Sequence, residues 1–295
     1  MENLIQPIVL DSLKKELTTS KLIKQTKNKN EIYIFSSKDS PNLLQELGRL
    51  RELTFRNAGG GTGKPVDLDE FDNFFQQLIV WNPQDEEIVG GYRFALMKDL
   101  FKDGKILSPT EELFDFSTKF IQEYLPYSIE LGRSFIQPKY QNTLYSLFNL
   151  WNGLGHLVKE NREIKYFFGK VTMYQKYNEQ AKLLILYFLE KHFPDTEKLL
   201  KPKTEFEDKS LQESIHLLKG IFLKNSYRED KSILKTSLSK FNERIPPLIS
   251  SYMDLSPTMK SFGTAFNKKF GNTIETGILI TIKDIHEELM ERYLS

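Results

Sequence analysis

Apolar and polar positions along the chain fall into alternating and helical periods, which together predict a sheet interleaved with amphipathic helices. Residues 31–36 alternate cleanly and read as a strand. A helix is expected next, with Ser40 as its N-cap and Pro41 at its first position. Further strands are expected at residues 77–81, 88–97, 127–138, 166–172, 258–266 and 276–282. Further helices are expected from Asn142 or Thr143 to about Glu160, and at 175–192.

Two segments stand apart from this alternation. Residues 1–30 mix apolar positions with many lysines and are predicted to form a basic, amphipathic N-terminal segment. This segment is either a solvated basic face or a surface that meets anionic lipid or an acidic carrier protein. Residues 195–244 are highly charged and are predicted to be a helical insertion. We expect both to belong to a single domain spanning residues 1–295.

The strand expected at residues 127–138 carries two charges in an otherwise apolar stretch. Glu130 and Arg133 stand in its middle, with Gly132 between them. Because burying an unpaired charge costs several kcal/mol, a buried strand holds charged residues only when they form an ion pair or belong to a functional site. Gly132 is a natural place for a β-bulge, which would re-aim one of the charges. A satisfied ion pair and a functional site both remain open on this evidence.

Composition narrows the class of protein. With 39% hydrophobic and 27% charged residues and a net charge of +1, the 295-residue chain is typical of a soluble globular protein. The balanced charge gives no sign of a nucleic acid partner. The chain has no cysteine, so disulfides and thiolate nucleophiles are excluded, and the wide spacing of its four histidines argues against a histidine-rich metal site. No apolar run reaches transmembrane length and no signal peptide is evident, so we expect a cytoplasmic protein that can work at a membrane surface.

A glycine-rich loop and an acidic segment follow the first helix. Within the loop at residues 57–65, residues 58–64 fit the loose spacing of a phosphate-binding loop. Pro65 replaces the expected hydroxyl residue, however, and the loop follows a helix instead of a strand. A substrate lid with glycine hinges is the better hypothesis. The carboxylates of Asp67, Asp69, Glu70 and Asp72 come next; they suit recognition of a substrate ammonium, or else form a solvated turn.

The order of these elements resembles that of Gcn5-related N-acyltransferases. The motifs resemble more closely the bacterial branch that makes ornithine and glycine lipids, which is related to acyl-homoserine-lactone synthases. From about Glu31 to Ile280 the chain is similar to glycine-lipid N-acyltransferases of Bacteroides-like bacteria. The matching motifs are Arg51 and Phe55, Asp69 and Asp72, Gly91–Arg93, Glu130–Arg133, and residues 59–64, 166–173, 245–249 and 256–260.

This resemblance implies an α/β (α+β) fold, with a mixed, mostly antiparallel sheet flanked by helices. It implies transfer of a long 3-hydroxyacyl chain to the α-amine of an amino acid, glycine first and ornithine or serine next. Glu130 would act as the base, and Arg133 and Arg93 would orient its carboxylate or that of the substrate. Arg51, Phe55, Asp69 and Asp72 would contact substrate. No cofactor or metal is implied beyond acyl carrier protein or coenzyme A as carrier of the acyl group.

One departure bears on the acyl donor. Coenzyme-A-using relatives usually follow the central strand with a glycine-rich loop that holds the pyrophosphate, and residues 138–145 lack those glycines. Acyl carrier protein is therefore the expected donor and partner. Since such carriers are acidic, Lys139 and the N-terminal lysines are candidate contacts. Peripheral association with the inner membrane is expected as well.

Two alternatives remain. An acyl-homoserine-lactone-type synthase using S-adenosylmethionine shares Arg51, Phe55, Glu130 and Arg133. A non-catalytic module that binds acyl chains or carrier protein would keep Glu130 and Arg133 as a structural pair.

Overall fold

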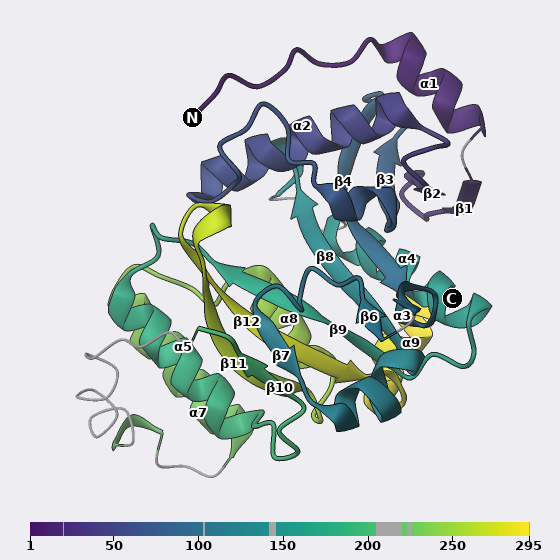
Figure 1. Cartoon of the computed structure of the whole chain (residues 1–295). Coiled ribbons are helices and arrows are strands. Elements are labelled where there is room, and N and C mark those ends of the chain that lie inside the picture. Colours follow the sequence, from purple (N-terminus) through teal and green to yellow (C-terminus); the bar gives the residue numbers. More distant parts are fainter. Residues whose placement is uncertain (20, 103, 142–145, 205–219, 223–225, 295) are drawn as a thin grey trace.

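The structure is a computed structural model that describes residues 1–19, 21–102, 104–141, 146–204, 220–222 and 226–294 (Figure 1). Its centre is an eight-stranded sheet in the order β1-β2-β3-β4-β8-β9-β12-β11. All neighbouring strands are antiparallel except β8 and β9, which are parallel. The strands are β1 (Lys21–Gln25), β2 (Glu31–Phe35), β3 (Gln76–Asn82), β4 (Glu87–Leu96), β8 (Ser128–Ile136), β9 (Tyr166–Met173), β11 (Lys260–Asn267) and β12 (Thr273–Thr281).

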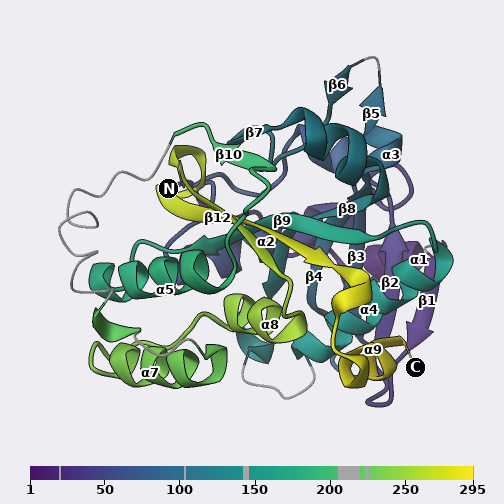
Figure 2. The same ribbon diagram turned by 90° about the horizontal axis from the view of Figure 1, so that it is seen from below.

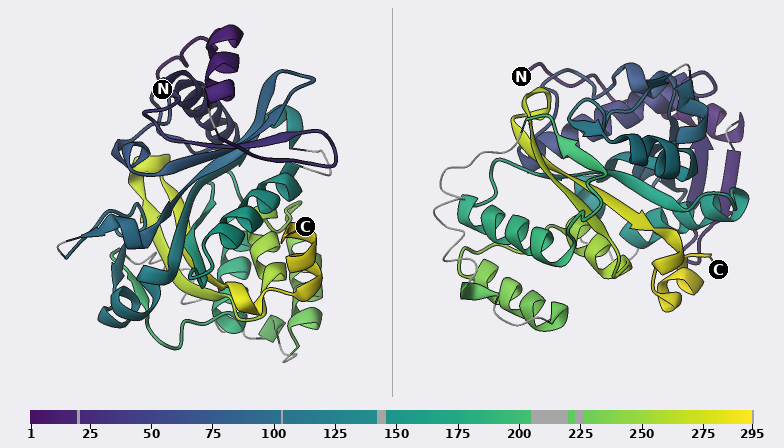
Figure 3. Two further views of the ribbon diagram at one scale, coloured as in Figure 1. Left: turned by 90° about the vertical axis from the view of Figure 1, so that its right-hand side faces the viewer. Right: turned by 60° about the horizontal axis from the view of Figure 1, so that its bottom comes forward.

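Helices cover both faces of this sheet. In Figure 1, α2 lies across one end with α1 above it, and α5 and α7 lie together at the other end. Figure 2 shows α7, α8 and α9 along one side, with α4 beside α9. Figure 3 shows the strong twist from the first strands to the last. The helices are α1 (Leu10–Thr19), α2 (Pro41–Ala58), α4 (Ser146–Glu160), α5 (Glu179–His192), α7 (Tyr227–Ser239), α8 (Pro247–Leu255) and α9 (Glu287–Leu294).

Residues 97–127, nearly all of which sequence patterns leave unassigned, form short elements over the sheet. Those elements are α3 (Met97–Leu100), β5 (Phe101–Lys102), β6 (Lys105–Ile106), β7 (Phe114–Phe116), a π-turn (Phe120–Tyr124) and a 3₁₀ turn (Leu125–Tyr127). Strand β7 pairs with β10 (Leu200–Pro202). Other 3₁₀ turns are Glu70–Asn73, Pro138–Tyr140, Lys268–Phe270 and Ile282–Asp284.

Buried apolar residues form separate clusters on the two faces. One cluster joins Ile129 and Leu131 of β8 to α4, α5, α8 and their neighbours. The opposite face carries two clusters: one under α1 and α2 that includes Phe135, and one under β7 and β10 that includes Phe168. Glu130 lies on this second face, opposite Ala95 in the β4–β8 ladder. The charged site therefore lies between two apolar clusters on one face of the sheet.

Most sequence-predicted elements form as expected, with shifts at their ends. The N-terminal segment differs, because β1 pairs with β2 as the edge strand of the main sheet and Leu13 and Leu17 of α1 are buried. Glu16 of α1 also accepts hydrogen bonds from the first backbone amides of α2, at Asn42 (3.0 Å) and Leu43 (2.7 Å). The segment at residues 1–30 is thus part of the fold and not only a surface. The cap expected at Asn142 or Thr143, and much of the region 195–244, lie outside the described residues.

Strands β8 and β9 diverge halfway along their length. They pair only from Ser128 to Leu131 on β8 and from Tyr166 to Gly169 on β9. Close pairing at the end of this ladder needs Gly169, because a Cβ there would stand 2.3 Å from the Leu131 carbonyl oxygen. Beyond that point each strand continues with its other neighbour alone. The divergence opens a gap in the middle of the sheet.

Candidate active site

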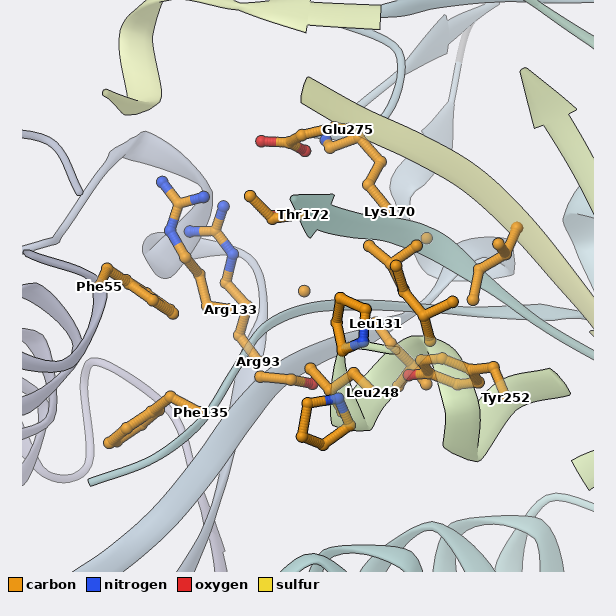
Figure 4. A pocket seen from close by; sticks show the side chains of 18 of the residues that line it. Phe55, Arg93, Leu131, Arg133, Phe135, Lys170, Thr172, Leu248, Tyr252 and Glu275 are labelled. Atoms are coloured by element: carbon orange, nitrogen blue, oxygen red, sulfur yellow. The ribbon is translucent and has the colours of Figure 1, made fainter. Parts of the chain in front are cut away.

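A cavity of about 440 Å³ occupies the gap between β8 and β9. Its polar end is lined by Arg93, Glu130, Arg133, Lys170, Thr172 and Glu275, which come from four strands. Its apolar part passes to the other face of the sheet and is lined by Leu131, Leu150, Phe167, Leu248, Tyr252, Ile278 and Ile280, among others. Figure 4 shows the charged side chains above and to the left, with Leu131, Leu248 and Tyr252 below. The cavity therefore suits a ligand with a polar head and an apolar chain.

Glu130 is held at the polar end with one carboxylate oxygen left without a partner. The side chain is only 1% exposed. Its Oε1 accepts hydrogen bonds from the Thr110 backbone amide (2.9 Å) and from Thr110 Oγ1 (2.6 Å), whereas Oε2 is buried and unpartnered within the described residues. Burial raises the pKa of Glu130, and the charge of Lys170 and hydrogen bonds from Ser108 and Thr110 oppose that rise. A buried carboxylate with one open oxygen is chemically suited to accept a proton.

Lys170 and Glu275 lie next to Glu130 on the same face. Lys170 follows Phe168, the register partner of Glu130, by two residues along β9. Its Nζ donates to the Pro109 carbonyl oxygen at 2.5 Å, and its side chain extends toward Glu275 in Figure 4. Burial lowers the pKa of Lys170, while Glu275 and Glu130 act to raise it. The turn at residues 108–110 thus contacts both Glu130 and Lys170.

Arginines and aspartates form a buried ion-pair network beside the cavity. Arg51 Nη1 lies 2.9 Å from Asp72 Oδ1, and Arg93 Nη1 lies 3.2 Å from Asp72 Oδ2. Arg93 also binds Asp69 with both terminal nitrogens, at 2.5 and 2.9 Å. Burial acts to raise the pKa of Asp72, but Arg51 and Arg93 outweigh it and hold that pKa well below its usual range. The network is an internal charge balance that keeps the arginines in fixed positions.

A β-bulge aims Arg133 at this network. The β4–β8 register places two residues of β8, Arg133 and Ser134, opposite Tyr92 alone. Arg133 itself takes a left-handed conformation with φ of +53°, which costs a non-glycine residue about 1–3 kcal/mol. Its Nε lies 2.8 Å from Asp67 and its guanidinium stacks on Phe270 at 4.5 Å. The bulge foreseen at Gly132 is present, one residue later.

The sequence-predicted site residues gather here, with contacts that differ from those expected. Among the described residues, Arg133 and Arg93 form no ion pair with Glu130, since they pair with aspartates instead. Asp69 and Asp72 are likewise occupied by arginines, so the expected role of binding a substrate ammonium does not fit them. The physical reason is proximity: the acidic segment and the arginines compensate each other's charge at close range. Phe55 lines the cavity and packs edge-on against Phe270, with ring centroids 5.1 Å apart.

The glycine-rich loop is hydrogen-bonded to Glu52 of α2, and its role as a hinged lid stays a prediction. The buried Glu52 carboxylate accepts hydrogen bonds from the Thr62 amide (2.9 Å), the Thr62 hydroxyl (2.9 Å) and the Gly63 amide (2.7 Å). Arg56 Nε also donates a hydrogen bond to Glu52 Oε1 at 2.7 Å. Gly59, at the end of α2, and Gly63 adopt positive φ angles that favour glycine.

Sequence reasoning missed several residues of the site. Lys170 carries the same signal that singles out Glu130, a charge inside an apolar strand, and that signal could have found it. Glu275 lies within β12 but one residue before position 276, where that strand was expected to start. Asp67 was noted only as part of an acidic segment, and Thr110 lies in a region with no recognisable pattern.

Comparisons with known proteins agree with this geometry. Residues 50–151 match the family model described as an acetyltransferase (GNAT) domain. Together with the sheet and with the full-length relatives described next, this match defines the class: the protein is an N-acyltransferase of the GNAT fold.

Two curated relatives define the family more closely. A protein of Phocaeicola vulgatus named glycine N(alpha)-acyltransferase is 47% identical over 306 residues, which cover 100% of this chain and 93% of that protein. A protein of Bacteroides thetaiotaomicron with the same name is also 47% identical, with 100% and 90% coverage. The chain belongs to this family, as the resemblance in the sequence had indicated.

Solved structures are more distant. The coenzyme-A-dependent acyl-homoserine lactone synthase MesI gives a TM-score of 0.38 at 11% identity, over 89% of this chain and 92% of that one. The acyl-homoserine lactone synthase LasI gives 0.34 at 17% identity, over 52% and 73%. Scores this low support no comparison of sites. No helix in the described part of the chain has both the length and the hydropathy needed to cross a membrane.

Proposed function

We propose that this N-acyltransferase moves a long 3-hydroxyacyl chain from acyl carrier protein to the α-amine of glycine, forming a lyso amino-acid lipid. The relatives' names support glycine as the acceptor. The cavity carries the proposal, because it joins a charged end around Glu130 to an apolar end on the other face of the sheet. A small polar amine and a fatty chain would meet where β8 and β9 part.

The proposed chemistry is direct aminolysis of the thioester. The glycine ammonium first loses one proton to water. As the neutral amine nitrogen then attacks the thioester carbonyl carbon, Glu130 Oε2 takes a second proton from that nitrogen. Backbone N–H groups on the part of β8 that β9 leaves unpaired would stabilise the resulting oxyanion. When the tetrahedral intermediate collapses, the carbon–sulfur bond breaks and the proton passes from Glu130 to the leaving thiolate. The result is an amide and a free pantetheine thiol.

The other site residues have supporting roles in this proposal. Phe55 contacts the substrates at the cavity wall. Arg93 and Arg133 shape the charged end, and Asp69, Asp72 and Arg51 hold those two arginines in place. The reaction needs no cofactor or metal beyond the acyl donor.

Acyl carrier protein is the proposed donor because the segment after β8 lacks glycine. Residues 138–140 form a 3₁₀ turn with bulky side chains where a coenzyme A pyrophosphate would need bare backbone. Lys139 is exposed but already paired with Asp85 (3.3 Å) and Glu87 (2.9 Å), so it is a weaker carrier contact than its charge alone indicates. We also propose that the protein works in the cytoplasm and binds peripherally to the inner membrane, since its product is an amphiphile.

The test is reconstitution with defined substrates. The purified protein would be incubated with 3-hydroxyacyl-carrier protein or the matching acyl-coenzyme A, and with glycine, serine or ornithine. Mass spectrometry of the lipid extract should reveal N-acylglycine, formed faster from the carrier protein. A product that requires S-adenosylmethionine would instead identify a lactone synthase. Carrier binding without any amide would leave a non-catalytic module.

A further inference from the structure

The described residues that line the cavity include three cationic side chains, and two of them are already neutralised. Arg93 is paired with Asp69 and Asp72, and Arg133 with Asp67 and Asp69. With Arg51, this network sets three arginines against three aspartates, so it carries no formal excess charge. It therefore offers little net attraction to a further anion.

Lys170 is the cationic group that remains. Among the described residues it forms no ion pair, and its one hydrogen bond goes to the uncharged Pro109 carbonyl. Because an ammonium group has three donors, two stay available toward the cavity. Its acidic neighbour Glu275 acts to raise the pKa of Lys170 without forming an ion pair with it, and Glu275 Oε1 accepts a hydrogen bond from Asn267 at 2.6 Å.

The charges at this end of the cavity match a zwitterion. Glu130 presents its open Oε2, and Lys170 stands on the adjacent strand, on the same face of the sheet. An amino acid carries an ammonium and a carboxylate two bonds apart on one carbon. Such a molecule can place its ammonium toward Glu130 and its carboxylate toward Lys170, which compensates two buried charges at once.

We propose that Lys170 binds the carboxylate of the acceptor amino acid and so selects α-amino acids over simple amines. This assignment rests on the proposed function and replaces Arg93 and Arg133 as the carboxylate-binding groups. Glu130 remains the group that takes the proton, and the turn at residues 108–110 sets the spacing between the two by contacting both.

The test compares glycine with glycinamide, which keeps the amine but has no carboxylate. Lys170→Met retains the length and bulk of the side chain and removes its charge. We expect the kcat/KM for glycine to fall about 10- to 100-fold, the scale of one hydrogen bond between charged groups, and that for glycinamide to change little. Lys165→Met is the matched control, because Lys165 is exposed and lies over Tyr127, outside the cavity.

The ratio of the two kcat/KM values separates recognition from indirect effects. Removing Lys170 also raises the pKa of Glu130, but that change slows both acceptors alike and cancels in the ratio. If glycinamide reacts too slowly to measure, the KM for glycine should rise while the KM for the acyl donor stays constant. An unchanged ratio, or an unchanged KM for glycine, in a folded Lys170→Met protein overturns this assignment. Wild-type protein that acylates no amino acid at all would instead overturn the proposed function.

Discussion

Replacing Glu130 with glutamine removes a proton acceptor while keeping the shape of the side chain. The amide oxygen of the introduced glutamine can still accept both hydrogen bonds that Thr110 gives to Oε1. The change is therefore confined to the Oε2 position, which has no partner among the described residues. An amide nitrogen placed there would be a buried donor without an acceptor, at a cost of about 1–3 kcal/mol in stability.

The expected loss of turnover is larger than this structural cost. General-base catalysis contributes roughly 10²- to 10⁴-fold, which corresponds to about 3–5 kcal/mol in the activation barrier. Because the hydrogen bonds to Thr110 persist, binding of the acyl donor should be nearly unchanged. We therefore expect a fall in kcat with little change in the KM of the donor.

The assay is single-turnover acylation of labelled glycine by purified protein, with thermal unfolding measured in parallel. Glu275→Gln is the control, because it removes a second carboxylate from the same end of the cavity. Turnover of Glu130→Gln within about threefold of the wild type would refute the base assignment. A larger loss in Glu275→Gln than in Glu130→Gln would transfer the role to Glu275.

The same variant has a predictable effect on stability as pH changes. Burial raises the pKa of Glu130 in the folded state above its ordinary value of 4.5, so the folded state binds this proton more tightly than the unfolded chain. The resulting stabilisation is present below pH 4.5 and is lost as pH rises through the folded-state pKa. Glutamine has no such dependence. The Tm of Glu130→Gln relative to the wild type should therefore increase as pH rises from 4, and a constant difference would contradict the raised pKa.

Three further changes test other parts of the site. Thr110→Val removes a hydroxyl that stabilises the charged form of Glu130, so the acidic limb of the profile of kcat/KM against pH should move to higher pH. A limb that does not move would show that Thr110 has no such role. Asp72→Ala leaves its two buried arginine partners, Arg51 and Arg93, without this carboxylate. The free energy of unfolding measured by urea titration should fall by about 3–5 kcal/mol. A loss below about 1 kcal/mol would show that the network is not structurally important. Leu248→Trp fills the apolar end of the cavity and should shift preference toward shorter acyl chains in competition assays; unchanged preference would place the chain elsewhere.

Much of the fold follows from local patterns. The alternating residues 31–36 form β2, and the apolar stretch with Glu130 forms β8. Helix α2 begins at Ser40-Pro41, as expected. These elements form as expected because period-two alternation and the preference of proline for the first turn of a helix depend on neighbours in sequence. The Ser40 side chain itself makes no capping hydrogen bond to α2. The short elements of residues 97–127 did not follow, since they are held by packing against the sheet and have little periodicity of their own.

The sequence by itself was enough to identify Glu130 as a charge in a buried strand and to indicate the family of the chain. Only the tertiary structure decided what each charge contacts. Residues far apart in sequence, such as Asp67 and Arg133, meet because strand order and the bulge in β8 bring them together. Ion pairing depends on distances of a few ångströms, and no spacing along the chain encodes them. For this reason the arginines expected at the substrate proved to be bound by aspartates, and Lys170 was left as the cationic group facing the cavity without an ionic partner in the described structure.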